Sequence, residues 1–461
     1  MWRPPVKPRA QPRPPFRKKG VGGIARAVRR GNFAFKYDRE CIGGLIMSLQ
    51  DRSDLILCFA KVLFANGQAT DQTISATERL GRALGLRATI IPRWGELAVQ
   101  AKDATARHSA QTAADPSGVD MDRVASTMRA VEDVESGRLS ENAAFQAIAA
   151  IAKAPPAPTL LFALAAAAGA VALSVIFGIE HFRPMVLIFV SAGAGAFLRR
   201  AVARISTNYL IQPFCAAVLA GVMGAIAVRC DLSSSLRLVA VCPCMVLVPG
   251  PHILNGALDL VAGRVHLGAA RLIYAGLIVL AITTGLLLGL ALLGVSLPVD
   301  PAGHSVPLWM DVIAAGVAVA AYSIFFSTPL TMLPWPVAVG MLAHALRWVA
   351  IAVFGLGVAT GALIACVVVA LILTPVSRRT HMPFAAIGFA SVVSMIPGVY
   401  LFRMGSGLIQ IAEGTQDATV LVNTAASGGA AAMIIFAMSF GLIIPKLIID
   451  YFGGRAARET P

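Results

Sequence analysis

The sequence predicts a mainly α-helical membrane protein: ten transmembrane helices form two inverted five-helix repeats, preceded by a small cytoplasmic α+β domain. Three observations support this fold class. The 461 residues are 57% hydrophobic and only 14% charged, whereas soluble domains carry roughly 25% charged residues. Apolar runs of about 20 residues, the length that crosses a bilayer, recur from residue 159 onward. Finally, a Pro-Gly pair interrupts an apolar run twice, at Pro249 and at Pro397.

The first 45 residues (1–45) form a basic tail rich in proline and arginine. Residues 1–40 contain 12 Lys or Arg and 2 Asp or Glu, which accounts for most of the net charge of +15. Such a composition cannot bury a hydrophobic core, so the tail is predicted to be disordered. Its charge suits an anionic membrane surface. We do not expect nucleic-acid binding, because aromatic residues are few and no folded nucleic-acid-binding motif accompanies the tail.

Residues 46–155 are predicted to form the cytoplasmic α+β domain, because their acidic and basic residues nearly balance. Apolar stretches that begin with capping residues, such as Ser53 and Asp54 in the first of them, predict helices. Stretches that alternate apolar and polar residues predict short strands. The expected elements are helices at 53–67, 70–85, 120–137 and 140–153, and strands at 87–92 and 94–100, followed by the linker "APPAP".

Membrane repeat 1 is assigned to residues 159–300 and repeat 2 to residues 306–450. Arginines gather in the loops that are cytoplasmic if the N-terminus is inside, including a loop expected to hold Arg264 and Arg271, whereas the loop "PVDPAGHSVP" has no Lys or Arg. This bias predicts that both termini are cytoplasmic. The expected spans are 160–179, 185–198, 209–228, 237–250, 271–297, 308–327, 335–351, 353–373, 383–402 and 421–445.

Three sequence echoes indicate an internal duplication. "VLVPGPHIL" (246–254) is echoed by "SMIPGVYLF" (394–402), with the Pro-Gly pair displaced by 148 residues. "AFLRR" is echoed by "ALRW" at the same displacement, and "ALSVIF" by "AYSIFF" one residue away from it. Five spans per half is an odd number, so the two halves must cross the membrane in opposite directions.

The two Pro-Gly pairs, Pro249-Gly250 and Pro397-Gly398, are predicted to break the spans that contain them. Proline removes a backbone donor and clashes with the preceding turn, and glycine lowers helix propensity. Backbone freed at membrane depth persists only where protein buries it or where it lines a wet cavity. One such break is usually a simple kink. A break repeated at the duplication spacing favours a central substrate site, as in secondary transporters.

Few ionisable or strongly polar side chains lie near the breaks, and each is costly inside a bilayer. His252, Asn255 and Asp259 follow the first break. The alternative for Asp259, Arg403, Glu413 and Asp417 is a solvated loop position, and the alternative for His344 is a hydrogen-bonded packing histidine. A histidine beside a break suits proton coupling, because its charge changes near neutral pH. The substrate candidates are Pro249, Gly250, His252, Asn255, Asp259, Pro397, Gly398 and Arg403; the proton-coupling candidates are His252, Asp259 and His344; Asp311, Arg347, Glu413 and Asp417 are further polar neighbours.

Other chemistries find little support. The seven cysteines include several in apolar runs and read as small buried hydrophobes. "CPC" at 242–244 has no second cysteine pair or histidines at zinc spacing, so no metal site and no cofactor are expected. The nucleotide-binding, hydrolase and metalloprotease motifs are missing, which argues against an enzyme and leaves an ion or substrate gradient as the energy source.

Several stretches resemble the threonine/serine exporters, ten-span transporters of the bacterial cytoplasmic membrane. They are "LFANGQATDQTISATERLGRALGL" and "VESGRLSENAAFQAIAAI" before the spans, and "LVPGPHILNGALDLVAGRVHLGAARL" and "IPGVYLFRMGSGLI" within them. The similarity covers about residues 50–450. The Pro-Gly pair with Asn255 and Asp259 is its most specific element. This resemblance implies export of small hydroxy amino acids in exchange for protons.

The sequence therefore favours a proton-linked exporter of small amino acids whose partners are its substrate, protons and the lipid bilayer; a homo-oligomer is compatible with it. Two alternatives stay open. One is a transporter of another small polar solute, such as a dicarboxylate or other organic acid. The other is a membrane-anchored sensor or scaffold that acts through its cytoplasmic domain, although an anchor needs neither ten spans nor paired breaks.

Overall fold

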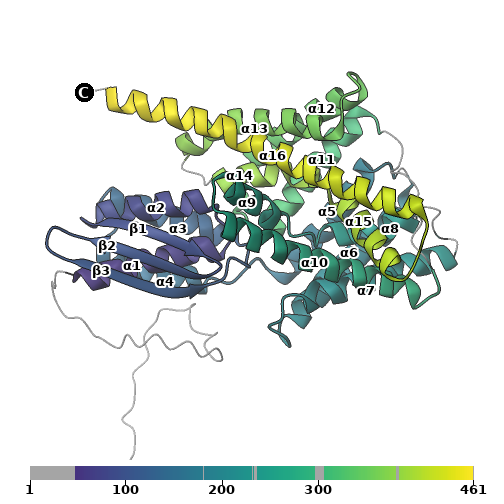
Figure 1. Ribbon diagram of the computed structural model, residues 1–461, viewed down its shortest axis with the longest axis horizontal. Coiled ribbons are helices and arrows are strands. Elements are labelled where there is room, and N and C mark those ends of the chain that lie inside the picture. The colour runs from purple at the N-terminus through teal and green to yellow at the C-terminus, as the bar shows by residue number, and fades with distance from the viewer. Residues whose placement is uncertain are drawn as a thin grey trace, which may run out of the picture. The chain divides into compact units, whose positions relative to one another are not determined.

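A computed structural model describes residues 47–179, 181–230, 232, 236–295, 306–380 and 384–459 of the chain (Figure 1). The basic tail predicted at residues 1–45 and most of the arginine-free loop at 298–307 lie outside the described residues. The described chain contains an α+β domain followed by a bundle of apolar helices.

The α+β domain pairs four helices with a three-stranded antiparallel sheet of order β1-β2-β3. Its core consists of apolar side chains of α1 and the sheet, among them Leu55, Phe59, Leu97 and Val99, all fully buried. The elements are α1 (Leu49–Ala65), α2 (Thr70–Ala83), β1 (Arg87–Arg93), β2 (Gly95–Lys102), β3 (Arg107–Ala114), α3 (Met121–Glu135) and α4 (Glu141–Lys153).

Two details of this domain differ from the sequence prediction. Helix α1 begins after Ser48, not at Ser53, because Ser48 and Asp51 form a capping box: each side chain bonds the backbone N–H of the other. Strand β3 was not predicted. The side of "RHSAQTAA" that packs carries His108, Ala110, Thr112 and Ala114, and Ala110 pairs with Val99 of β2. Two small residues and two polar ones give little hydrophobic contrast, so the alternation is weak.

The described residues of the membrane half contain eight helices long and apolar enough to cross a bilayer, and two bent helix pairs that would bring the total to ten if each pair is one span. The bent pairs are α8 with α9, and α14 with α15. Helix bounds are α5 (Thr159–Ile176), α6 (Phe182–Val202), α7 (Ile211–Arg229), α8 (Leu236–Met245), α9 (Gly250–Val261), α10 (Val265–Ala291), α11 (Leu308–Phe325), η1 (Leu330–Met332), α12 (Pro334–Ala352), α13 (Val358–Thr380), α14 (Phe384–Val392), η2 (Val393–Met395), α15 (Gly398–Ala412) and α16 (Ala418–Glu459).

The fourth span was expected to end at residue 250 and the ninth at residue 402, and the structure continues each with more helix, α9 to Val261 and α15 to Ala412. Each bent pair is a broken span or a re-entrant loop. One placement needs correction. Arg271, expected in an inner loop, lies in α10 and is fully buried. Its turn of helix is otherwise apolar, and burial is possible because a carboxylate, Asp259, lies within ion-pair distance.

Helix packing follows the same scheme in residues 159–291 and 308–459. In the first stretch α5 packs on α6, α6 on α7, α7 on α10, and α9 on α10; in the second α11 packs on α12, α12 on α13, α13 on α16, and α15 on α16. The short helices α8 and α14 occupy matching positions against α5, α6 and α7 and against α11, α12 and α13. Helices α7 and α10 cross closely at Gly289, where an added Cβ would collide with the Val218 carbonyl oxygen. The lack of a side chain on this glycine therefore permits the close approach.

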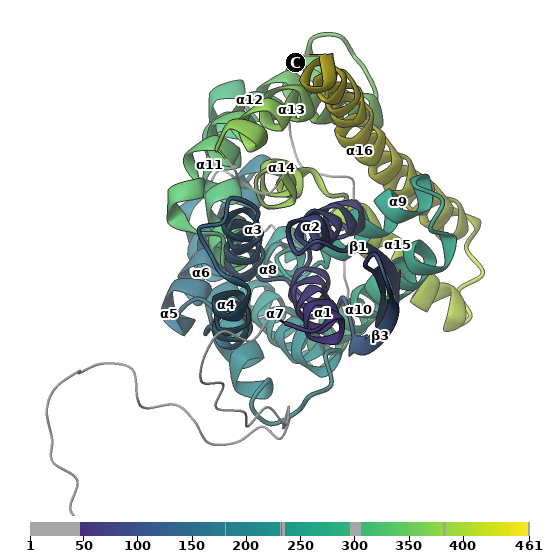
Figure 2. The same ribbon diagram turned by 90° about the vertical axis from the view of Figure 1, so that its left-hand side faces the viewer.

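The α+β domain contacts helices from both ends of the membrane half. Strand β1 lies against α10 and α3 against α14 (Figure 2). The Met121 N–H at the start of α3 donates to the Phe326 carbonyl oxygen at the end of α11, over 2.9 Å. Trp94, between β1 and β2, packs on Tyr274 of α10, with the ring centroids 5.0 Å apart and the ring planes inclined at 47°. The domain and the helices thus share one packed interface.

Candidate substrate site at the paired helix breaks

The first break is an inverse γ-turn centred on Pro249. Its φ of −79° and ψ of 59° fall in that conformation. The N–H of Gly250 donates to the Val248 carbonyl oxygen over 2.8 Å, the i to i+2 bond of such a turn. Helices α8 and α9 meet there at 59°. The turn bonds the glycine N–H that proline would otherwise leave without a partner.

The second break has nearly the same geometry. Pro397 has φ −76° and ψ 51°, and the Gly398 N–H donates to the Ile396 carbonyl oxygen over 2.7 Å. The stretch 387–395 and α15 meet at 54°. Both Pro-Gly pairs, spaced by 148 residues, therefore build the same local structure, as the sequence echo predicts.

The two breaks lie against each other. The Ile396 side chain packs so closely on Gly250 that a Cβ there would collide with it, while Met245 and Val248 pack on Gly398 at ordinary distances. The Met245 carbonyl oxygen before the first break accepts the Val248 N–H over 3.2 Å and the Tyr322 hydroxyl over 3.3 Å. A cavity of about 10 Å³ remains between the breaks, lined by Leu173, Met245, Val248, Tyr322, Val393, Ser394, Ile396 and Gly398.

Asp259 of α9 is the centre of a buried polar cluster that joins the membrane half to the α+β domain. Its carboxylate lies 2.9 Å from Arg264 Nε and 3.2 Å from Arg271 Nε, and it accepts a hydrogen bond of 3.0 Å from the Thr70 hydroxyl of α2. Arg264 also bonds Asp71 over 2.7 Å. Asp259 is therefore a buried, paired carboxylate and not a solvated loop charge.

His252 and Asn255 also face the α+β domain. The Asn255 amide donates to the Gly67 carbonyl oxygen over 3.1 Å. His252 is buried, with its ring set edge-on to Tyr274 at 5.1 Å. Its Nδ1 has no hydrogen-bond partner among the described residues. Asn255 and Asp259 thus hold the connection between α1 and α2, while His252 packs on α10.

A second buried polar cluster lies beside the other break. His344 lies in α12, and both of its ring nitrogens are within hydrogen-bonding distance of a partner. Nδ1 is 3.1 Å from an Asp311 carboxylate oxygen, and Nε2 is 2.8 Å from the Ser394 hydroxyl. Asp311 comes from the first turn of α11, and Ser394 from η2, three residues before Pro397. All three residues are buried. This chain of groups connects a titratable imidazole to the turn before the break.

The remaining candidates lie farther along the chain. Arg403 is half-buried in the second turn of α15. Glu413 ends that helix, and Asp417 lies in the following turn, both exposed. The Asp417 carboxylate accepts the Thr419 N–H over 2.9 Å, so these two acids are solvated loop charges. Within the described residues, no three His, Cys, Asp or Glu side chains are grouped as metal ligands would be.

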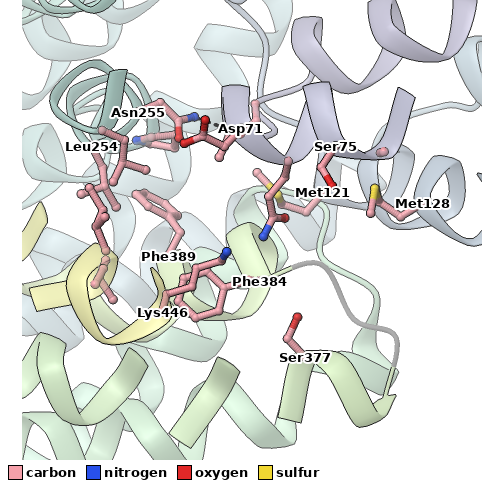
Figure 3. A pocket seen from close by; sticks show the side chains of 18 of the residues that line it. Asp71, Ser75, Met121, Met128, Leu254, Asn255, Ser377, Phe384, Phe389 and Lys446 are labelled. Atoms are coloured by element: carbon pink, nitrogen blue, oxygen red, sulfur yellow. Dashed lines mark hydrogen bonds between the residues drawn. The ribbon is translucent and has the colours of Figure 1, made fainter. Parts of the chain in front are cut away.

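A cavity of about 650 Å³ lies between the α+β domain and the membrane half (Figure 3). Helix α9 contributes Asn255, and α2 contributes Asp71; Figure 3 shows these two on the same wall, with Lys446 and Phe384 below them. The lining residues are Gly67, Ala69, Asp71, Gln72, Ser75, Ala76, Arg79, Met121, Met128, Glu132, Pro251, Leu254, Asn255, Leu258, Ser377, Arg378, Phe384, Phe389, Leu442, Ile443, Lys446 and Leu447.

Sequence reasoning missed the partners of its own candidates. Ser394 was not singled out, although it precedes a Pro-Gly pair by three residues. Thr70 carries no signal, because a threonine at a helix start usually only caps it. Arg271 does carry one: it is the single charge in the apolar run of α10, where a charge needs a partner.

Comparison with known families gives two matches. A threonine/serine exporter model, ThrE, matches residues 54–293. A second model, described as Threonine/Serine exporter, ThrE, matches residues 311–448. The first match covers the α+β domain and the helices through α10, and the second covers the helices from α11 onward. No solved structure matches the chain.

Proposed function

The chain belongs to the threonine/serine exporter family, and we propose that it is a secondary transporter that exports threonine, serine or similar small amino acids. Export proceeds across the bacterial cytoplasmic membrane by antiport against protons. Both termini face the cytoplasm, and the α+β domain is cytoplasmic.

The observation that carries this mechanism is the contact between two breaks of nearly the same geometry. Each is an inverse γ-turn at a Pro-Gly pair, and Ile396 of one packs on Gly250 of the other. Broken helices whose ends meet at mid-membrane are the substrate sites of many secondary transporters. The matched helix packing of the two halves supports their origin as inverted five-helix repeats, in which transport rocks one half against the other.

The substrate is held where the breaks meet. The helices α9 and α15 begin at Gly250 and Gly398, and a helix start carries partial positive charge that favours a carboxylate. In this proposal Pro249 and Pro397 keep the ends open. His252, Asn255 and Asp259 line the cytoplasmic approach along α9, and Arg403 lies on the approach along α15.

The structure favours His344 over His252 and Asp259 as the coupling group. Asp259 is held by two arginines, Arg264 and Arg271. His344 instead connects a single carboxylate, Asp311, to the Ser394 hydroxyl beside the break. Protonating the ring turns both nitrogens into donors, so Ser394 Oγ would then have to accept a bond, which couples the proton to the turn that precedes Pro397.

Two further ionisable groups lie in this region. Arg347 of α12 is close enough to His344 to interact with it electrostatically, and Tyr400 of α15 is close enough to interact with Arg347. Only one half of the chain carries this cluster. At the 148-residue spacing, Asp311, His344 and Ser394 correspond to Ala163, Ala196 and Val246, which are buried apolar side chains. One coupling site per chain is therefore expected.

The experiment is counterflow in proteoliposomes that contain the purified protein. Labelled L-threonine and L-serine should accumulate against unlabelled amino acid inside, and succinate should not. An imposed pH gradient should accelerate threonine flux by the wild type. His344→Gln should keep threonine–threonine exchange and lose that acceleration, whereas His252→Gln keeps both. No threonine or serine flux by the wild type would refute the proposed function, and succinate flux would favour an organic-acid transporter.

A further inference from the structure

The 650 Å³ cavity between the α+β domain and the membrane half lies outside the contact between the breaks. Cavities that bind small molecules typically measure roughly 300–1,000 Å³. Its walls come from α2 and α3 on the domain side, and from α9, α14, α16 and the end of α13 on the membrane side. Both the α+β domain and the membrane half are therefore needed to form it.

Charges of both signs line this cavity. Asp71 and Glu132 come from the domain, whereas Arg378 and Lys446 come from the membrane half. Asp71 uses one carboxylate oxygen for Arg264 but keeps 66% of its side chain exposed. The fifth charge, Arg79, is bonded by Glu135, and that hydrogen bond raises the Arg79 pKa.

This arrangement matches the charges of a zwitterion. An α-ammonium group would face the acids of the domain, and an α-carboxylate group would face the bases of the membrane half. A dianion would meet Asp71 and Glu132 unfavourably, and a dication would meet Arg378 and Lys446 unfavourably. The charge pattern thus selects molecules that carry one charge of each sign.

The cavity also offers groups for a short side chain. Ser75 and Asn255 present hydrogen-bonding atoms; the Asn255 amide nitrogen is taken by Gly67, which leaves its oxygen to accept a bond from a hydroxyl. Met121 and Met128 supply flexible apolar surface beside them, and Figure 3 shows Ser75 between these two methionines. In a side chain with a β-hydroxyl and a methyl group, the hydroxyl can therefore bond to Ser75 or Asn255, and the methyl can pack on Met121 or Met128.

The cavity ends next to the first break. Pro251 and Phe389 line it, and the Phe389 ring would lie 3.3 Å from a Cβ at Gly250. Ile396, which also packs on Gly250, lines the small cavity between the breaks. Phe389 of the outer cavity and Ile396 of the small cavity therefore both pack on Gly250.

We propose that this cavity is a cytoplasmic recognition site for zwitterionic small amino acids, shared between α2 and α3 of the domain and the membrane half, from which substrate passes Phe389 and Ile396 to the breaks. The inference rests on the proposed transport function. It gives the α+β domain a direct part in binding substrate: Asp71, Ser75 and Glu132 act as ligand-facing residues.

The first test is protection of an engineered cysteine. Ser75→Cys places a thiol in the cavity, and Ala83→Cys places one on an exposed part of the same helix outside it. Both are made in a chain whose native cysteines are replaced by serine or alanine and whose flux is checked. L-threonine should slow alkylation of the Ser75→Cys thiol by a maleimide several-fold, succinate should not, and neither should affect the Ala83→Cys thiol.

The second test blocks the cavity in intact protein. Ser75→Trp should reduce threonine counterflow at least tenfold, while Ala83→Trp keeps wild-type flux and both proteins elute identically in detergent. If threonine gives no protection and Ser75→Trp transports normally, the cavity is not a recognition site, although wild-type flux would still support the transporter. Protection by threonine in a wild type without flux would do the reverse: the binding site would stand and the proposed transport function would fail.

Discussion

The buried ion pair between Asp259 and Arg271 allows a quantitative prediction. The two side chains are 1% and 0% exposed, and their charged atoms are 3.2 Å apart. With an effective dielectric constant of about 20, two unit charges at that separation attract each other by about 5 kcal/mol. Removing one partner of a buried pair leaves the other charge uncompensated, which typically costs about 3–5 kcal/mol.

We therefore expect Asp259→Asn to lower the free energy of unfolding by about 3–5 kcal/mol, because Arg271 then has no carboxylate partner among the described residues. Arg271→Met should cost less, since Asp259 keeps Arg264 and the Thr70 hydroxyl. The two substitutions together should cost less than the sum of the single ones by more than about 1 kcal/mol, because residues in contact are not additive.

The assay is denaturant titration of the purified protein in detergent, followed by tryptophan fluorescence; Trp94 packs on Tyr274 at the same interface and reports on it. The control is the exposed pair between Arg138 and Asp133, whose side chains are 65% and 42% exposed. Such surface pairs contribute about 0–1 kcal/mol. The reasoning fails if Asp259→Asn is as mild as Asp133→Asn, or if the double variant shows simple additivity.

Two further predictions address the repeats and the breaks. Ile205 and Val353 are exposed positions 148 residues apart. In inverted repeats, Ile205→Cys should react with an impermeant thiol reagent added on the cytoplasmic side, and Val353→Cys with the reagent added on the opposite side. Reaction of both from one side would rule out the inverted repeats. Gly250→Ala should impair flux, since the added methyl collides with Ile396, whereas Gly398→Ala has room and should transport normally; equal flux from both would show that the break contact is not needed.

Local patterns predicted the helical architecture and the breaks. The long apolar helices are visible because each run alone satisfies the length that a bilayer requires. The breaks are visible because proline and glycine act on their own backbone, so Pro249 and Pro397 could be read without a partner. Strand β3 was missed because its packing side alternates His108 and Thr112 with Ala110 and Ala114, which gives little contrast in hydropathy with the exposed side.

The polar clusters could not be predicted because their members meet only through tertiary packing. Thr70 reaches Asp259 from 189 residues away, and Ser394 reaches His344 from 50 residues away. Sequence spacing therefore could not show that Asp259 is held by arginines and a threonine, or that His344 connects a carboxylate to a break. It identified the residues but not the groups that determine their chemistry.

The hydrogen bond between Met121 and Phe326, together with the hydrogen bonds to α9, restricts how the two halves of the membrane region can move. The α+β domain holds the first half of the membrane region through Gly67 and Thr70, and the second half through Met121. Because the domain is hydrogen-bonded to both halves, relative motion of the halves must break one set of these bonds or strain the domain. A donor and an acceptor fluorophore placed on the domain and on α11 should then change their energy-transfer efficiency once in each transport cycle. Single turnovers could thus be timed without a labelled substrate.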